Sequence, residues 1–130
     1  MHASSIGSDR RDAVIRVVPE SDEIVAICLE GDFDLSNAAA LSTEVDRALE
    51  DRNNLILDLS EATFIDTSVV HVLVHASKAV NGNGNGVVLQ LGTAAVVERV
   101  LEIAAIERVL SRAHDRQEAV RIVQQQAGTM

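Results

Sequence analysis

Three consecutive residues, Asp66-Thr67-Ser68, combine a carboxylate with two hydroxyls at a point where a helix is expected to begin. Asp, Ser and Thr accept hydrogen bonds from the unpaired N–H groups of a helix N-terminus, so one role for Thr67 is a helix cap. The other role is phosphorylation, which would add about −1.5 to −2 charges directly beside Asp66. Taken alone, the spacing favours a helix cap over a phosphorylation site.

Four polar residues follow the same helical stripe at spacings of three and four: Ser68, His71, His75 and Lys78. Two histidines at i and i+4 can hold a metal, but there is no intervening Glu of the metalloprotease type, and few carboxylates flank them. Ser68 and His71 could form a hydroxyl-base pair, although no oxyanion loop or third orienting residue accompanies them. The sequence therefore predicts no metal site and no enzyme, and an exposed ridge on an otherwise buried helix.

Two further features have a chemical and a structural interpretation. The segment Asn81-Gly82-Asn83-Gly84-Asn85-Gly86 could cradle a phosphate, but it lacks a Lys-Ser/Thr pair and precedes a strand, which favours a mobile helix-to-strand connection. Cys28 is the single cysteine and lies in an apolar run, which favours a buried structural thiol over a nucleophile.

Composition limits the class of protein. The chain has 130 residues, 47% of them hydrophobic, which suits one compact domain with an aliphatic core. A formal charge of −9, two Phe and no Trp or Tyr argue against nucleic-acid binding. We see no secretory signal and no membrane-spanning run, and expect a cytoplasmic protein. Residues 1–12 are expected to be disordered, and residues 13–126 to form the single domain.

Hydrophobic periodicity predicts strands that alternate with helices, and therefore an α/β fold with a mixed sheet. A short turn between the first two strands predicts an antiparallel pair there. A crossover loop is expected between the strand ending at Leu59 and the helix at Thr67. Asp34 or Ser36 should cap the first helix, and Asp115 the last. The predicted strands are 13–18, 23–30, 54–59, 87–91 and a weak one at 109–113; the predicted helices cover about 36–50, 67–80, 96–104 and 115–126.

Three segments in order resemble the signatures of STAS domains, specifically the anti-sigma factor antagonists. Leu57-Asp58-Leu59-Ser60 through Phe64-Ile65-Asp66-Thr67-Ser68 is similar to a strand and helix start in which the family has Asp-Ser-[Ser/Thr]-Gly. Leu29-Glu30-Gly31-Asp32-Phe33-Asp34 resembles its L-x-G-x-[LF]-D, and Val97–Ile106 its third helix and following turn. The resemblance runs from about Val14 to Val123.

The resemblance implies a mixed sheet of four to five strands with about four helices, and a role in partner switching. Such a domain binds an anti-sigma factor, often a serine-threonine kinase, until the hydroxyl residue after the Asp is phosphorylated. Here that residue is Thr67, with Ser68 as second choice. The implied partner-binding residues are Asp34, Asp66, Thr67, Ser68, His71 and His75. ATP belongs to the kinase, so the chain itself needs no cofactor; a homodimer is left open.

Two departures from the family pattern keep alternatives open. Thr67 replaces the usual Ser, and Val69 the usual Gly, which makes Asp-Thr-x-Val closer to STAS domains of stress-signalling scaffolds. The first alternative is therefore a scaffold module without a switch of its own. The second is a small-ligand or nucleotide-binding protein with Asp34, Asp66 and the Gly-rich segment around a pocket.

Overall fold

The structure, a computed structural model, describes residues 11–127 apart from the side chains of Asn81 and Asn83. These residues form one five-stranded sheet in the order β1-β2-β3-β4-β5. β1 is antiparallel to β2 and the other neighbours are parallel, which confirms the predicted mixed sheet. The elements are β1 (Val14–Pro19), β2 (Ile24–Phe33), α1 (Leu35–Glu50), β3 (Asn54–Ile65), α2 (Thr67–Asn83), β4 (Val87–Gln90), α3 (Ala95–Ile103), the short 3-10 helix η2 (Ile106–Arg108), β5 (Ser111–Ala113) and α4 (Arg116–Ala127).

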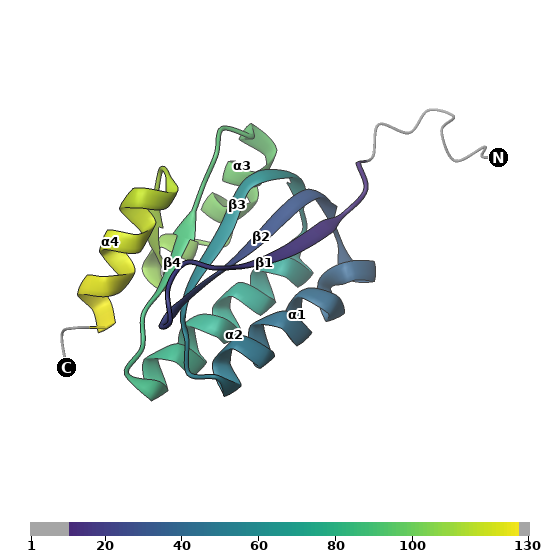
Figure 1. Cartoon of the computed structure of the whole chain (residues 1–130). Helices are drawn as coiled ribbons and strands as arrows, with labels where there is room; N and C mark the ends of the chain where they lie inside the picture. The colour runs from purple at the N-terminus through teal and green to yellow at the C-terminus, as the bar shows by residue number, and fades with distance from the viewer. Residues whose placement is uncertain (1–10, 128–130) are drawn as a thin grey trace, which may run out of the picture.

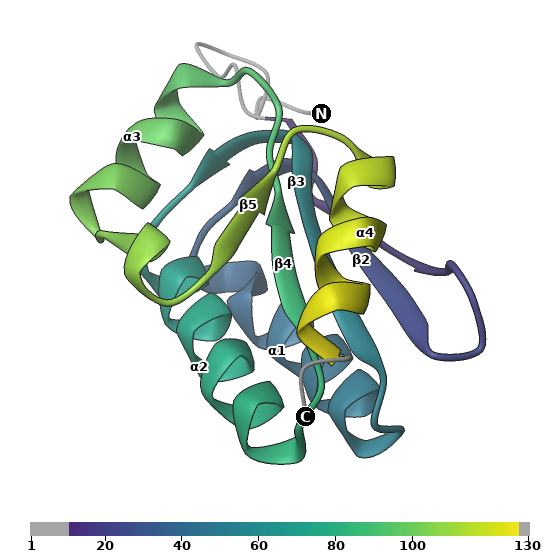
Figure 2. The ribbon, with the colours of Figure 1, turned by 90° about the vertical axis from the view of Figure 1, so that its left-hand side faces the viewer.

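The helices cover the two faces of the sheet unequally (Figures 1 and 2). α1, α2 and α3 pack on one face and enclose the larger core, in which Phe33, Leu57 and Leu73 are fully buried. α4 packs alone on the other face, over a smaller cluster that includes Ile56, Ala119 and Val123. No described helix is long and apolar enough to cross a membrane.

β2 and β3 are longer than the sequence predicted, and this changes the approach to α2. β3 continues from Asn54 to Ile65, so the expected crossover loop after Leu59 is wrong. Its register with β2 shifts between Cys28 and Glu30 and again between Gly31 and Asp32. Such irregularities interrupt the alternation of buried and exposed residues, which is why the second half of β3 does not have the sequence pattern of a strand.

The Asn-Gly repeat is less of a loop than predicted, because α2 continues to Asn83. Gly84 has a φ of +77°, the left-handed conformation that commonly ends a helix. The rest of the connection is bonded on both sides: Asn85 Nδ2 donates to the Arg52 carbonyl at 2.9 Å, and the Gly86 N–H donates to Asn54 Oδ1 at 2.8 Å. The mobile connection expected over all six residues is therefore wrong for its two ends.

Both ends of the described chain are attached to the sheet. The expectation of disorder falls mainly on residues 1–10, which lie outside the described residues. Arg11 is described: its N–H donates to Asp32 Oδ2 at 3.1 Å, and its carbonyl accepts from the Asp32 N–H at 3.1 Å. At the other end, Gln126 Oε1 accepts from the Val87 N–H of β4 at 2.8 Å. Asp115 caps α4 as predicted, since its Oδ1 accepts from the Glu118 N–H at 2.8 Å.

Gly31 and Gly82 allow a paired test of this architecture. Gly31 has a φ of +89° and a Cβ there would overlap the Asp12 carbonyl, so Gly31→Ala should lower the free energy of unfolding by about 2 kcal/mol or more. Gly82 lies in α2 with open space around it, so Gly82→Ala should raise it by about 0.5 kcal/mol. Urea unfolding measures both, and effects of the same sign would contradict this account.

Candidate functional site

The starts of α1 and α2 lie next to each other at one end of the sheet. β2 and β3 are parallel neighbours, and their last paired residues are Phe33 and Ile65. The next residue on each strand is an aspartate, Asp34 and Asp66, and a helix begins directly after it. The fold therefore brings together the two carboxylates that the sequence analysis selected from separate motifs.

Asp66, and not Thr67, caps α2. Its Oδ1 accepts from the Ser68 N–H at 3.0 Å and from the Ser68 hydroxyl in a short hydrogen bond. Its carbonyl accepts from the N–H groups of Val69 and Val70. The cap role that spacing favoured for Thr67 is therefore wrong. Thr67 is the first residue of α2, it is exposed, and its hydroxyl makes no hydrogen bond to any described residue.

The start of α1 is built in the same way. Asp34 Oδ1 accepts from the Ser36 N–H at 2.9 Å and from the Ser36 hydroxyl at 2.6 Å. Asn37 completes a capping box by accepting from the Asp34 N–H at 2.8 Å. Of the two predicted caps, Asp34 is the correct one. In α1, Leu35 occupies the position that Thr67 has in α2, and it is 76% exposed.

The surface around Thr67 mixes polar and apolar groups. Leu35 is exposed on the neighbouring helix start, and Phe64, near the end of β3, is 39% exposed. Both aspartates hold hydrogen bonds from the serine two residues ahead, which leaves Thr67 as the hydroxyl of α2's first turn without a partner in the described chain. Exposed apolar side chains beside polar groups are typical of surfaces that contact another protein.

The polar ridge on α2 is present but not uniform. His71, His75 and Lys78 are exposed, whereas Ser68 is half-buried and bonded to Asp66. His75 Nε2 lies 3.4 Å from Asp46 Oδ1 on α1, which packs beside α2 (Figure 1). The described residues contain no group of three or more His, Cys, Asp or Glu side chains placed to hold a metal ion.

The Gly-rich segment does not belong to this site. It includes the last residues of α2 and the connection after them, and a helix of 17 residues is about 25 Å long. Asp34 and Asp66 lie at the other end. A single pocket formed by both aspartates and the Gly-rich segment, as one alternative required, is therefore excluded by the length of α2.

A polar cluster under α4 was missed by the sequence analysis. The Arg116 guanidinium donates hydrogen bonds to four residues. One lies in the turn before β2, and the others lie in β2, β3 and β4. Its donors reach Gln90 Oε1 and Glu20 Oε2 at 2.7 Å each, Asp58 Oδ2 at 2.5 Å and Cys28 Sγ at 3.3 Å. Arg116 looked like an ordinary exposed residue of a polar helix; only Asp58, an acid within an apolar strand, indicated that a buried partner was needed.

The cluster is structural. Burial raises the pKa of the Cys28 thiol, and the hydrogen bond from Arg116 offsets part of that rise. Burial lowers the pKa of Arg116, but hydrogen bonds to Asp58 and Cys28 outweigh this and raise it overall. The thiol therefore stays protonated, and the expected buried, unreactive Cys28 is confirmed in its burial.

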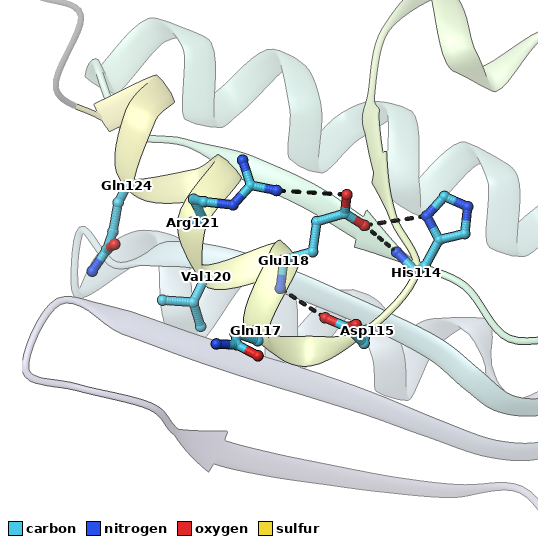
Figure 3. A pocket seen from close by; sticks show the side chains of 7 residues that line it. All are labelled: His114, Asp115, Gln117, Glu118, Val120, Arg121 and Gln124. Carbon is cyan, nitrogen blue, oxygen red and sulfur yellow. Dashed lines mark hydrogen bonds and ion pairs between the residues drawn. The ribbon is translucent and has the colours of Figure 1, made fainter.

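An open groove of about 630 Å³ runs along the outer side of α4 (Figure 3). Two of its polar side chains hold the helix start: Glu118 Oε1 accepts from the His114 N–H at 2.7 Å and lies 3.2 Å from His114 Nδ1. The His114 N–H and then the His114 ring lower the pKa of Glu118. The groove is on the opposite face of the sheet from α1 and α2. The bonds of His114, Asp115 and Glu118 are accounted for by capping of α4, so they do not indicate a bound ligand.

Comparison with known proteins agrees with this fold. The family model for the STAS domain matches residues 16–119, and the chain belongs to that family. A search of curated proteins found no match. Among solved structures, an anti-sigma factor antagonist from Mycobacterium paratuberculosis is 17% identical with a TM-score of 0.77, over 87% of this chain and 95% of that one.

Two further solved structures share the fold. An anti-sigma-factor antagonist (STAS) domain protein from Planctomyces limnophilus is 20% identical with a TM-score of 0.68, over 87% of this chain and 99% of that one. The Bacillus cell fate determinant SpoIIAA in its phosphorylated form is 14% identical with a TM-score of 0.66, over 84% and 99%.

Removing Arg116 should loosen α4 from the sheet. Arg116→Ala leaves Asp58 buried without its ion-pair partner, and should lower the free energy of unfolding by about 2–3 kcal/mol. The loss is smaller than for a fully buried ion pair because the Arg116 side chain is 29% exposed. Labelling of Cys28 by a thiol reagent should accelerate at least about tenfold. Arg121→Ala, on the exposed side of α4, is the control and should change stability by less than about 0.5 kcal/mol. Equal effects of the two variants would contradict the structural role of the cluster.

Proposed function

We propose that this STAS domain is an anti-sigma factor antagonist whose binding to an anti-sigma factor is switched off by phosphorylation of Thr67. The single observation that carries the proposal is the state of Thr67, an exposed hydroxyl without an internal partner at the start of α2. The solved anti-sigma factor antagonists with this fold, one of them in a phosphorylated form, support it. The domain then acts by binding, and catalysis belongs to the partner kinase.

The switch has a simple physical basis. In the free protein a phosphate on Thr67 is tolerated, because the N-terminus of α2 carries a partial positive charge and water surrounds the site. In a complex, the same phosphate would be buried beside Asp66 and among the apolar side chains of Leu35 and Phe64. Burying an uncompensated charge costs several kcal/mol, enough to reverse a complex of moderate affinity.

The departure at Val69 bears on the alternative of a scaffold module. Val69 is fully buried in the core under α2. The exchange of the family's usual Gly for Val therefore fills internal space and leaves the surface around Thr67 unaltered. A scaffold module would use the same surface without the switch. Incubation with ATP and candidate anti-sigma kinases, followed by mass spectrometry of the peptide containing residues 66–71, distinguishes the two functions.

An acidic residue at position 67 should imitate the switch. Thr67→Glu should weaken binding of the anti-sigma factor at least about tenfold, because a carboxylate in the interface is costly. Thr67→Ala should bind like the unmodified chain and keep its stability within about 0.5 kcal/mol, since Thr67 is not the cap. Isothermal titration with both folded variants measures this.

The matched control is Thr43→Glu, the same exchange at an exposed threonine of α1 two turns beyond the helix start. It should leave the affinity unchanged. If Thr43→Glu weakens binding as much as Thr67→Glu, added charge alone explains the effect. If Thr67→Glu and Thr67→Ala bind equally well, the phosphorylation switch is wrong.

The ridge on α2 should contribute to the same interface. His71→Glu and His75→Glu are exposed changes and should each alter stability by less than about 0.5 kcal/mol. Both should weaken anti-sigma binding, His71→Glu more strongly because His71 is one turn from Thr67. If both variants bind the anti-sigma factor as tightly as the unmodified chain does, the docking surface does not include this side of α2. Zinc should not raise the melting temperature.

A further inference from the structure

His71 lies where a phosphate on Thr67 would meet it. The two residues are separated by four positions on α2, so they are neighbours on one side of the helix. Side chains in a helix lean toward its N-terminus, which directs the His71 ring over the turn that begins with Thr67. Both residues are exposed, and His71 makes no hydrogen bond or ion pair with a described residue.

A phosphate at this helix start would find few of the usual donors. A phosphate at a helix N-terminus is ordinarily held by free backbone N–H groups. Here Asp66 already accepts from the N–H groups of Ser68, Val69 and Val70. The Asp66 carboxylate also repels a phosphate and disfavours its approach to the cap. Any attraction beyond that of the helix dipole must therefore come from a side chain.

The charged groups around α2 leave His71 as that side chain. From α1, Asp46 faces the next histidine, His75, at 3.4 Å. β3 contributes two acids and no base: Asp58, which is paired with Arg116 on the opposite face, and the exposed Glu61. β4 has no ionisable side chain. The loop that Ser77 contacts through the Val109 carbonyl contains Glu107 and Arg108. Among residues 67–71 and the first turn of α1, His71 alone can become a cation.

We propose that phosphorylation of Thr67 creates an ion pair between the phosphate and the His71 imidazolium on the same helix. This inference rests on the proposed function and specifies its regulation: the phosphate withdraws His71 from the docking ridge and holds it as a counter-ion. The unbound phosphorylated domain is stabilised as a result, so one modification removes two contacts from the interface. The ion pair needs a protonated His71 and a doubly charged phosphate, so it is favoured where the pH lies between the second pKa of the phosphate and the pKa of His71.

The test places phosphothreonine at position 67 by peptide ligation or codon suppression, so it needs no kinase. NMR titration of the histidine rings should show the pKa of His71 rising by about 0.5–1 unit on phosphorylation, while that of His75 shifts much less. By reciprocity, the phosphate should have a lower second pKa in the phosphorylated protein that keeps His71 than in the phosphorylated His71→Gln variant. Phosphorus NMR measures this pKa.

His75→Gln and Arg108→Gln are the controls, and neither should alter the phosphate titration. Equal shifts for His71 and His75, or a phosphate titration that changes with Arg108→Gln and not with His71→Gln, would overturn the pairing. These outcomes are separate from the proposed function. The absence of any kinase for Thr67 would refute the switch in the cell, whereas a missing His71 shift would refute only the ion pair.

Discussion

The parallel pairing of β2 with β3 is the constraint on which the site depends. Because Phe33 pairs with Ile65, the two strands end at the same level and the two following helices begin side by side. The starts of both helices then use the same chemistry, an aspartate that accepts from the backbone and hydroxyl of the serine two residues ahead. A shift of this register by one residue would separate Thr67 from Leu35 and turn alternate side chains to the wrong face.

The repeated Asp-x-Ser arrangement also explains why Thr67 is the free hydroxyl. A third copy, Asp58-Leu59-Ser60, occurs inside β3, where Asp58 Oδ1 accepts from the Ser60 N–H and hydroxyl and Oδ2 receives Arg116. In every copy the serine hydroxyl is used to satisfy a carboxylate. The middle residue of each copy takes no part in this bonding, and of the middle residues Leu35, Leu59 and Thr67 only Thr67 has a hydroxyl. Leu59 is buried, Leu35 is exposed but unreactive, and Thr67 can be modified.

The sequence predicted the elements whose signals are local. The mixed sheet, the four helices and the caps at Asp34 and Asp115 follow from periodicity and from cap residue types. The second half of β3 was missed because its bulged pairing with β2 leaves Glu61, Thr63 and Phe64 exposed without alternation. The cap at Thr67 was misassigned by one residue, since Asp and Thr are both good caps and only backbone geometry separates them. The Arg116 cluster joins residues as far as 96 positions apart, a relation that no local pattern contains.

The two faces of the sheet differ in how their helices are held. α4 adds only a small apolar cluster and is held at its ends by side-chain hydrogen bonds, from Arg116 at its start and from Gln126, whose Oε1 accepts from the Val87 N–H at 2.8 Å. The opposite face contains the larger core, into which both α1 and α2 pack their buried side chains. If the proposed docking surface is made of these two helix starts, their attachment to the core would limit the conformational entropy lost on binding. Under the proposed function, a modest interface would then suffice, and a single phosphate on Thr67 would be enough to oppose it.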